Sequence, residues 1–258
     1  MTTDDINELI LAKEKLENPS IAAKLTNLIG KPVEAGFEKL PASLNKNLQK
    51  ITEKALMASM RSALFTIDDK PGSQKSNRLH KISVAVSGGI GGAFGMAALA
   101  IELPISTTII MRSIADVARS EGESVYKNET RLACMEVFAL GSPNNSEDDA
   151  VESGYYVIRG LLAHSMSAAA HHIASKGLTA EGSPALLKMI SMIAQRFSIQ
   201  VSEKLAAQAL PIIGAAGGAL INTLFIHHFQ ELAHGHFVVR RLERKYGMQI
   251  VANTYHEL

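Results

Sequence analysis

The stretch SGGIGGAFGMAALAIELPISTTIIM, residues 87–111, decides how this chain folds. It places five glycines within eight residues and continues as an apolar run in which Glu102 is the one charged side chain before Arg112. Three interpretations are open: a loop that cradles phosphate, a segment that crosses a membrane, or a buried helix that packs unusually close to its neighbours.

The glycines match neither of two nucleotide-binding motifs. The dinucleotide fingerprint needs glycines at i, i+2 and i+5 after a strand. Gly89 and Gly91 meet the first two conditions, but the third position is Phe94. The phosphate-binding loop needs a Gly-Lys-Ser/Thr tripeptide, which the sequence lacks. Spacing and context therefore argue against a phosphate cradle.

Two uncharged or nearly uncharged runs are long enough to cross a bilayer, residues 82–111 and 205–226. The first run is rich in Gly, Ala, Ser and Thr, which insert weakly. Glu102 would be costly in hydrocarbon, and Pro104 is expected to kink or end the helix. Pro211 breaks the second run.

Both runs carry small residues four positions apart, which lets helix backbones approach closely. Glycine inside a helix costs about 1 kcal/mol relative to alanine, so this clustering indicates a purpose in packing or insertion. The glycines concerned are Gly88, Gly91, Gly92, Gly95, Gly214 and Gly218. Core helices of a bundle, and hairpins that enter a bilayer reversibly, both stay open.

The rest of the chain has a helical period. An amphipathic helix begins at Pro41, and Ser183-Pro184 suits an N-cap and first turn. One apolar stripe consists of Val151, Tyr155, Ile158 and Leu162, and another of Leu187, Ile190, Ala194, Phe197, Val201 and Leu205. No run of residues alternates convincingly between apolar and polar side chains, as a half-buried strand would. We predict an all-α fold, a compact multi-helix bundle with Gly-rich, closely packed central helices.

Composition narrows the function classes. Lys+Arg 26 against Asp+Glu 25 leaves a net charge of +1, which argues against a nucleic-acid binder. The single cysteine, Cys134, suits a reducing compartment, and its apolar context predicts an inert buried thiol. The N-terminus is acidic and does not resemble a secretory signal peptide. We expect a cytoplasmic protein.

Five ordered blocks look familiar: ELPISTTIIMRSIADVARSEGE (102–123), FALG (138–141), SGYYVIRG (153–160), LPIIGAAGGALIN (210–222) and HFVVRRLERKYG (236–247). Together they resemble the EcsC family of bacterial proteins, which is named for the third gene of an ABC-transporter operon and has no established activity. The resemblance implies an α-helical, membrane-proximal bacterial protein and supplies no catalytic residues. It also suggests membrane lipids, or a membrane complex such as an ABC transporter, as partners.

The resemblance covers residues 79–247, and a polar segment, DDKPGSQKSN (68–77), precedes it. We therefore predict an N-terminal helical segment over residues 1–70, an EcsC-like helical domain over 79–247 and a C-terminal tail over 248–258.

A metal site is one alternative. His227, Glu231 and His234 lie at i, i+4 and i+7, and Glu231 with His234 has the Glu-x-x-His spacing of di-iron bundles. The second such motif and the further carboxylates are missing. We expect no cofactor, with a transition metal as the alternative that would accompany a metal-assisted hydrolase. The Gly-x-Ser-x-Gly nucleophile motif is absent.

Charged residues near the apolar runs suggest a buried polar network, because a buried carboxylate without a partner would cost several kcal/mol. Its predicted members are Glu102, Arg112, Asp116 and Arg159. Surface ion pairs are the alternative.

The basic segment, defined as Arg240, Arg241, Arg244 and Lys245, alternates with apolar side chains. Such a helix suits an anionic membrane surface, although cations also favour a helix C-terminus, here before Gly247. The function predicted is thus a membrane-proximal, lipid-associating protein, peripheral on the inner face of the membrane. A metal-assisted hydrolase and a soluble protein-interaction module are the alternatives.

Overall fold

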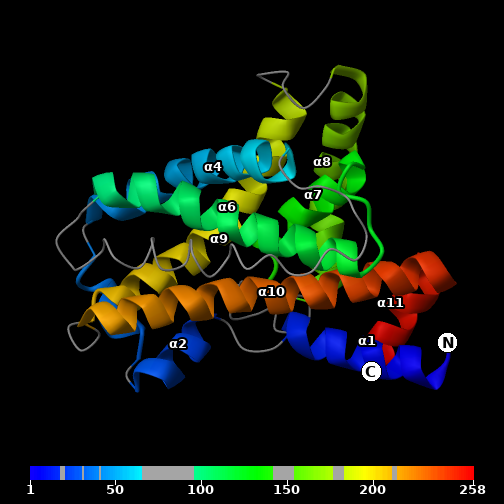
Figure 1. Ribbon diagram of the computed structural model, residues 1–258, viewed down its shortest axis with the longest axis horizontal. Helices are drawn as coiled ribbons and strands as arrows, with labels where there is room; N and C mark the ends of the chain where they lie inside the picture. The colour runs from blue at the N-terminus through cyan, green and yellow to red at the C-terminus, as the bar shows by residue number, and fades with distance from the viewer. Residues whose placement is uncertain are drawn as a thin grey trace.

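The computed structural model describes residues 1–17, 21–30, 32–40, 42–65, 96–141, 154–176, 183–210 and 214–258 (Figure 1). These residues form helices and turns without a strand, which confirms the all-α prediction. In chain order the helices are α1 (Thr3–Glu17), α2 (Ile21–Ile29), α3 (Glu34–Phe37), α4 (Ala42–Phe65), α6 (Met96–Ser120), α7 (Asn128–Glu136), the 3-10 helix η1 (Val137–Ala139), α8 (Tyr155–Lys176), α9 (Pro184–Gln208), α10 (Gly214–Tyr246) and α11 (Met248–Glu257).

Local sequence signals place several helix ends correctly. The amphipathic pattern after Pro41 forms α4. Ser183 caps α9, since its side chain accepts a hydrogen bond from the backbone N–H of Leu186 at 3.3 Å. One member of the predicted α9 stripe is wrong: Leu187 is 49% exposed and Leu186 is buried in its place. The rotation of α9 about its axis is set by α4 and α8, which pack on it, and not by its own period.

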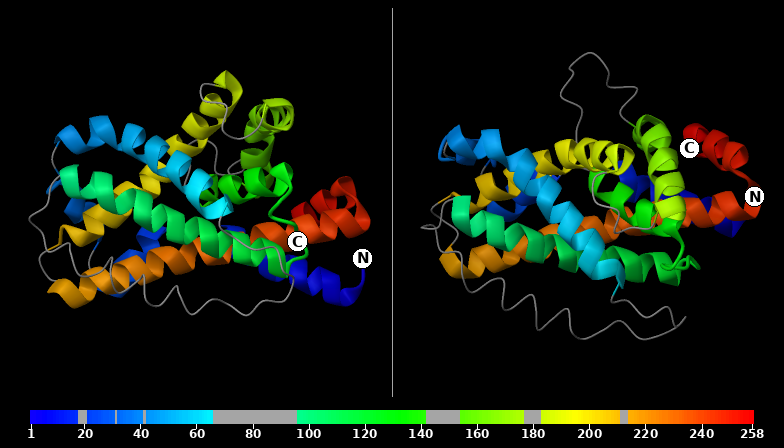
Figure 2. Two further views of the ribbon diagram at one scale, coloured as in Figure 1. Left: turned by 45° about the horizontal axis from the view of Figure 1, so that its top comes forward. Right: turned by 90° about the horizontal axis from the view of Figure 1, so that it is seen from above.

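The long helices α6 and α10 organise the bundle (Figure 1). They run in the same direction, lie close at their C-terminal halves and diverge toward their N-terminal ends (Figure 2). Gln230 of α10 donates to the Ser113 hydroxyl of α6 at 2.6 Å. Helix α4 packs on α6 and α9, and α1 packs on α10.

The predicted boundary at residues 68–77 lies outside the described residues, and the helices before it share a hydrophobic core with those after it. A single hydrophobic core runs from Leu9 of α1 to Tyr255 of α11. Gly235 of α10 lets α1 approach so closely that a Cβ there would lie 2.7 Å from Leu16 Cγ. The N-terminal helices therefore complete the bundle, and the tail is helical and contributes Val251 to the core.

Close packing at the predicted glycines finds no support at the one position where it can be examined. Gly88, Gly91, Gly92 and Gly95 lie outside the described residues. Gly214 begins α10. A Cβ added to Gly218 would meet no atom within 4 Å. Close approach occurs instead at Gly235 and at Gly36 of α3, which lies against the backbone of Ala206 in α9.

Pro104 does not end its helix, because α6 continues through it to Ser120. Proline removes one backbone donor from the helical ladder. Nearby hydroxyls add bonds to the local carbonyl oxygens: Thr107 donates to Leu103 at 2.6 Å and Thr108 to Pro104 at 2.7 Å. The run 205–226, in contrast, is divided between the end of α9 and the start of α10.

The glycine contacts give a direct test of packing. Gly36→Ala should lower the free energy of unfolding by about 1–3 kcal/mol, because the new Cβ would clash with the Ala206 carbonyl. Gly218→Ala should leave stability unchanged or raise it by up to about 1 kcal/mol, since the site is open and alanine favours helix. Urea unfolding followed by circular dichroism measures both. An equal loss in the free energy of unfolding from the two substitutions would contradict close packing at Gly36 and open space at Gly218.

Candidate functional site

Glu102 is buried and paired, as the sequence predicted, but with an unexpected partner. Lys204 of α9 donates to Glu102 of α6 at 2.9 Å, and their side chains are 2% and 9% exposed. The ammonium group also lies 5.1 Å from the ring centroid of Phe225. This pair joins two helices inside the core, where an unpaired charge would be very costly.

Of the four residues predicted to form one network, Glu102 and Arg159 have partners outside it, whereas Asp116 and Arg112 of α6 interact electrostatically. Asp116 of α6 accepts a hydrogen bond from Arg119 at 3.2 Å. Burial raises the pKa of the Asp116 carboxyl, and the charges of Arg119 and Arg112 only partly oppose this. Arg159 pairs with Glu243, which the sequence analysis did not select. Glu102 and Arg159 thus have partners that the sequence analysis did not select, because helical period does not specify which helix faces which charge.

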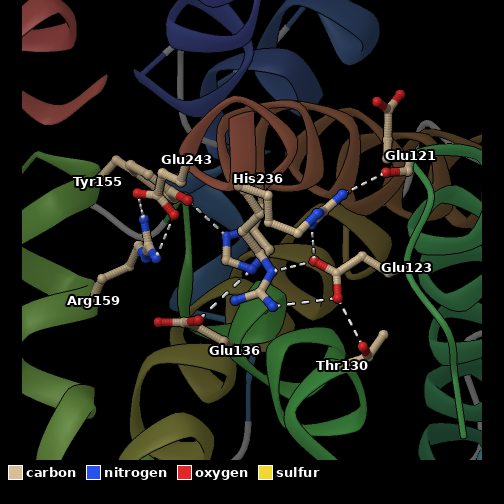
Figure 3. A network of polar contacts seen from close by, with 10 residues as sticks. Glu121, Glu123, Thr130, Glu136, Tyr155, Arg159, His236 and Glu243 are labelled. Atoms are coloured by element: carbon tan, nitrogen blue, oxygen red, sulfur yellow. Dashed lines mark hydrogen bonds and ion pairs between the residues drawn. The ribbon is translucent and has the colours of Figure 1, made fainter. Parts of the chain in front are cut away.

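Arg159 is part of a second polar network where α7, α8 and α10 meet (Figure 3). Its guanidinium donates to both carboxylate oxygens of Glu243, at 2.6 and 3.1 Å. Tyr156 donates to the same carboxylate at 3.1 Å. The side chains of Arg159 and Glu243 are 13% and 9% exposed, so this is a nearly buried, bidentate ion pair between α8 and α10.

The centre of this network is His236, which is fully buried on α10. Its Nδ1 lies 2.9 Å from the Tyr155 hydroxyl, and its Nε2 lies 3.7 Å from Glu136 Oε2 (Figure 3). Burial, together with the charges of Arg159 and Arg240, holds the pKa of His236 well below its usual range. The imidazole is therefore neutral at physiological pH, and one of its ring nitrogens can accept a hydrogen bond.

Burial also perturbs the two groups that flank His236. It raises the pKa of Glu136 to about 7, although Arg159 and Arg240 lower that pKa. It raises the pKa of Tyr155 well above its usual value, so the phenol stays protonated. A phenol, an imidazole and a carboxyl group are thus aligned in the interior, with two arginines nearby. Clusters of perturbed groups of this kind are typical of functional sites.

Arg240 completes the same region from the other side. Its Nε donates to Glu123 at 2.8 Å, and Arg244 and Thr130 donate to the same carboxylate. Burial raises the pKa of Glu123, but these donors outweigh it and the net pKa is lowered. Glu123 follows directly after α6, so this carboxylate fixes the end of α6 to α10.

The other cations of the basic segment are also paired within the molecule. Arg241 contacts Glu8 at 2.6 Å and Glu121 at 2.8 Å, and Lys245 contacts Asp5 at 2.8 Å. The hydrogen bonds from Lys245, Thr2 and Tyr246 hold the pKa of Asp5 below its usual range. Four cations therefore meet four carboxylates, Asp5, Glu8, Glu121 and Glu123, and the segment carries no local excess of positive charge.

The predicted metal ligands do not converge. His227 and Glu231 approach to 3.7 Å, but Glu231 is paired with Lys24 at 2.6 Å, and His234 faces Glu121. Across the part of the chain that the structure describes, no three His, Cys, Asp or Glu side chains could hold a metal ion together. Cys134 is buried, as predicted, and burial raises its pKa, which makes the thiol unreactive.

The residues that sequence reasoning missed are Glu136, Tyr155, His236 and Glu243. Tyr155 was counted as apolar because it occupies a helical stripe. Glu136 gave the clearest available signal, since it is the only charged residue in LACMEVFAL (132–140), a segment too apolar to be exposed. His236 gave none, because a histidine in a charged helix is usually at the surface.

The hydropathy of the helices tests whether any of them could cross a membrane. Within the described helices none is long and apolar enough to cross a bilayer.

A family model, the EcsC protein family, matches residues 4–242. The match begins 75 residues earlier than the resemblance did, so the N-terminal helices belong to the family fold. Neither a curated protein nor a solved structure matches the chain.

The pKa of Glu136 predicts a pH-dependent stability. Between pH 4.5 and about 7 the folded protein keeps a proton that the unfolded chain releases, so stability falls as pH rises. Glu136→Gln should remove this loss of stability. At about pH 8 its free energy of unfolding should exceed that of the wild type by on the order of 3 kcal/mol. Near pH 4.5 the free energies of unfolding of the variant and the wild type should be similar. Urea unfolding at several pH values measures the difference.

Glu203 titrates in the same window, because burial raises its pKa to about 7. It is present in both proteins, so it cancels in the comparison of Glu136→Gln with the wild type. Parallel stability curves for the two proteins would show that Glu136 is ionised in the folded state.

The Arg159–Glu243 pair predicts a large mutational effect. Arg159→Ala should lower the free energy of unfolding by about 3–5 kcal/mol, because it leaves Glu243 buried without its cation. Lys188→Ala, at an exposed position of α9, should stay within about 0.5 kcal/mol. The double variant Arg159→Ala/Glu243→Ala should lose less than the sum of its single variants. Equal losses in Arg159→Ala and Lys188→Ala would disprove a buried pair.

Proposed function

The chain belongs to the EcsC protein family, and from this premise we propose that it is a membrane-proximal protein that associates with lipid through an uncharged surface. We call this surface the uncharged end. It consists of residues 96–111 of α6 and 214–226 of α10. Both segments lie where their helices begin, on the left of Figure 1. Lipid is the proposed partner, and attachment is peripheral.

Charge supports this choice of surface. The uncharged end contains one ionisable side chain, Glu102, and its carboxylate is buried against Lys204. The opposite ends of α6 and α10 carry the basic segment and its carboxylates. Charge is therefore polarised along these two helices, and their first halves can meet hydrocarbon without desolvating an exposed charge of their own.

Exposed apolar side chains support it further. Ile101 and Ile105 lie one turn apart on α6 and are 68% and 45% exposed, and Leu220 of α10 is 50% exposed. Removing these three side chains from water would contribute on the order of a few kcal/mol. That magnitude suits reversible attachment at the headgroup level.

The basic segment is the weaker candidate for an anchor. Its cations already have carboxylate partners, and those pairs hold α1 and the turn after α6 against α10. Reversing the four charges would therefore break these internal ion pairs as well as any lipid contact. Because Arg244 and Lys245 are 44% and 54% exposed, headgroup contact there would be an auxiliary interaction.

Flotation of the full-length protein with vesicles of phosphatidylcholine and phosphatidylglycerol tests the proposal. Wild type should float with the vesicles, and Ile101→Ser/Ile105→Ser should bind at least about tenfold more weakly because two apolar anchors are removed. The matched control is Leu11→Ser/Leu187→Ser, which changes two leucines of similar exposure on α1 and α9.

Salt separates the two surfaces. Binding through the uncharged end should persist at high ionic strength, whereas binding through the basic segment should be lost. Wild type that fails to float, or equal binding by the isoleucine variant and its control, would refute the proposal. Failure to float would direct attention to a protein partner of the uncharged end, such as a membrane complex.

A further inference from the structure

Helix α11 is joined to α10 by a single residue, Gly247. Its backbone has φ +92° and ψ 144°, a conformation that residues with a side chain rarely adopt. The chain reverses here within one residue, so α11 folds back toward α1 and α8 (Figure 2). A rotation confined to Gly247 would move α11 as a unit and leave α10 unchanged.

Two buried side chains and the ring contacts of Tyr255 and His256 with α8 hold α11 in place. Val251 and Tyr255 are its buried residues, whereas Met248 and Ile250 are 63% and 54% exposed. Lys13 of α1 donates to the Tyr255 carbonyl at 3.0 Å. The family match ends at residue 242, within α10, and does not include α11.

The inner face of α11 covers the His236 network. The ring centroid of Tyr255 lies 5.7 Å from that of Tyr155 and 5.2 Å from that of Tyr156. Directly behind Tyr155 are His236 and then Glu136. Tyr155 is 2% exposed while α11 is in place.

The covered groups are unusual for a purely structural core. A phenol lies within hydrogen-bond distance of an imidazole, and a carboxyl group faces the other imidazole nitrogen, which has no hydrogen-bond partner. A hydroxyl, an imidazole and a carboxyl group follow one another in the same order in sites that activate a hydroxyl, although here the carboxyl group of Glu136 lies 3.7 Å from the imidazole and does not bond to it. Well-packed apolar residues would fill the same space at a lower desolvation cost.

We propose that α11 is a hinged lid over a buried acid–base site formed by Tyr155, His236 and Glu136, and that the site opens when α11 turns about Gly247. The closed state is the one described above. In the open state Tyr155 and Tyr156 line the entrance, and His236 becomes reachable from solvent. This property is independent of lipid association at the uncharged end, which lies at the other end of α10.

Acylation by diethyl pyrocarbonate tests the lid, because the reagent attacks accessible neutral imidazoles. Three histidines of α10 provide the readout in one protein: His227 is exposed, His228 is buried away from α11, and His236 lies under it. In Val251→Ala/Tyr255→Ala, which undocks α11 in the full chain, the rate at His236 relative to His228 should rise at least about tenfold over wild type.

The control variant is Met248→Ala/Ile250→Ala, which alters exposed side chains of the same helix and should leave that ratio unchanged. An unchanged ratio in the undocked variant would overturn the proposal, whether both rates stay low or rise together. Reporting a ratio keeps the result clear even if the undocked variant is less stable, since general unfolding would expose both histidines.

Hydrogen exchange in the wild-type protein tests the hinge itself. Amides of residues 251–257 should exchange at least about tenfold faster than those of residues 225–242 in α10, because α11 opens without global unfolding. Equal protection of the two segments would show that α11 is part of the rigid core, and would also overturn the proposal.

Discussion

The carboxylate of Glu123 fixes the position of α10, and the rest of the bundle depends on this. It accepts hydrogen bonds from Arg240 and Arg244 of α10 and from Thr130 of α7 at the point where α6 has just ended. Three segments far apart in the sequence are thereby held at one place. Because the carboxylate is 6% exposed, water cannot readily replace these donors. Losing them would leave a buried charge without partners, which is costly, so the geometry is enforced.

The same electrostatic rule explains why charge is distributed so unevenly. Buried charges persist only where a partner lies opposite, so they occur at helix junctions such as Glu102 with Lys204 and Arg159 with Glu243. Elsewhere the buried faces of the helices are largely uncharged. The consequence is that most charged junctions gather toward the C-terminal ends of α6 and α10. In the first halves of these two helices the one charged side chain, Glu102, is buried with its partner, and apolar side chains are exposed.

The His236 network departs from this rule in an informative way. Its Nε2 has no hydrogen-bond partner among the described residues, and the nearest oxygen of Glu136 lies 3.7 Å from it. The bundle thus keeps incompletely satisfied polar groups in its interior, beneath the one helix that lies outside the family match. Buried polar groups without hydrogen-bond partners lower the stability of a protein. Proteins tolerate such groups mostly where they serve a function.

The sequence by itself determined the helices and much of what they bury. Apolar period and capping placed α4 and α9, Cys134 was recognisable as a core residue, and Glu102 had to have a partner because a lone buried carboxylate is too costly. Each of these conclusions follows from residues within a few positions of one another.

Only the tertiary structure decided which groups meet. Arg240 and Glu123 are 117 positions apart, and Tyr155 and His236 are 81. A helical period gives the direction of a side chain relative to its own axis, but not the rotation of that axis or the neighbour it faces. For this reason the cations of the basic segment looked free in the sequence and are paired in the fold, and for the same reason the site around His236 could not be predicted.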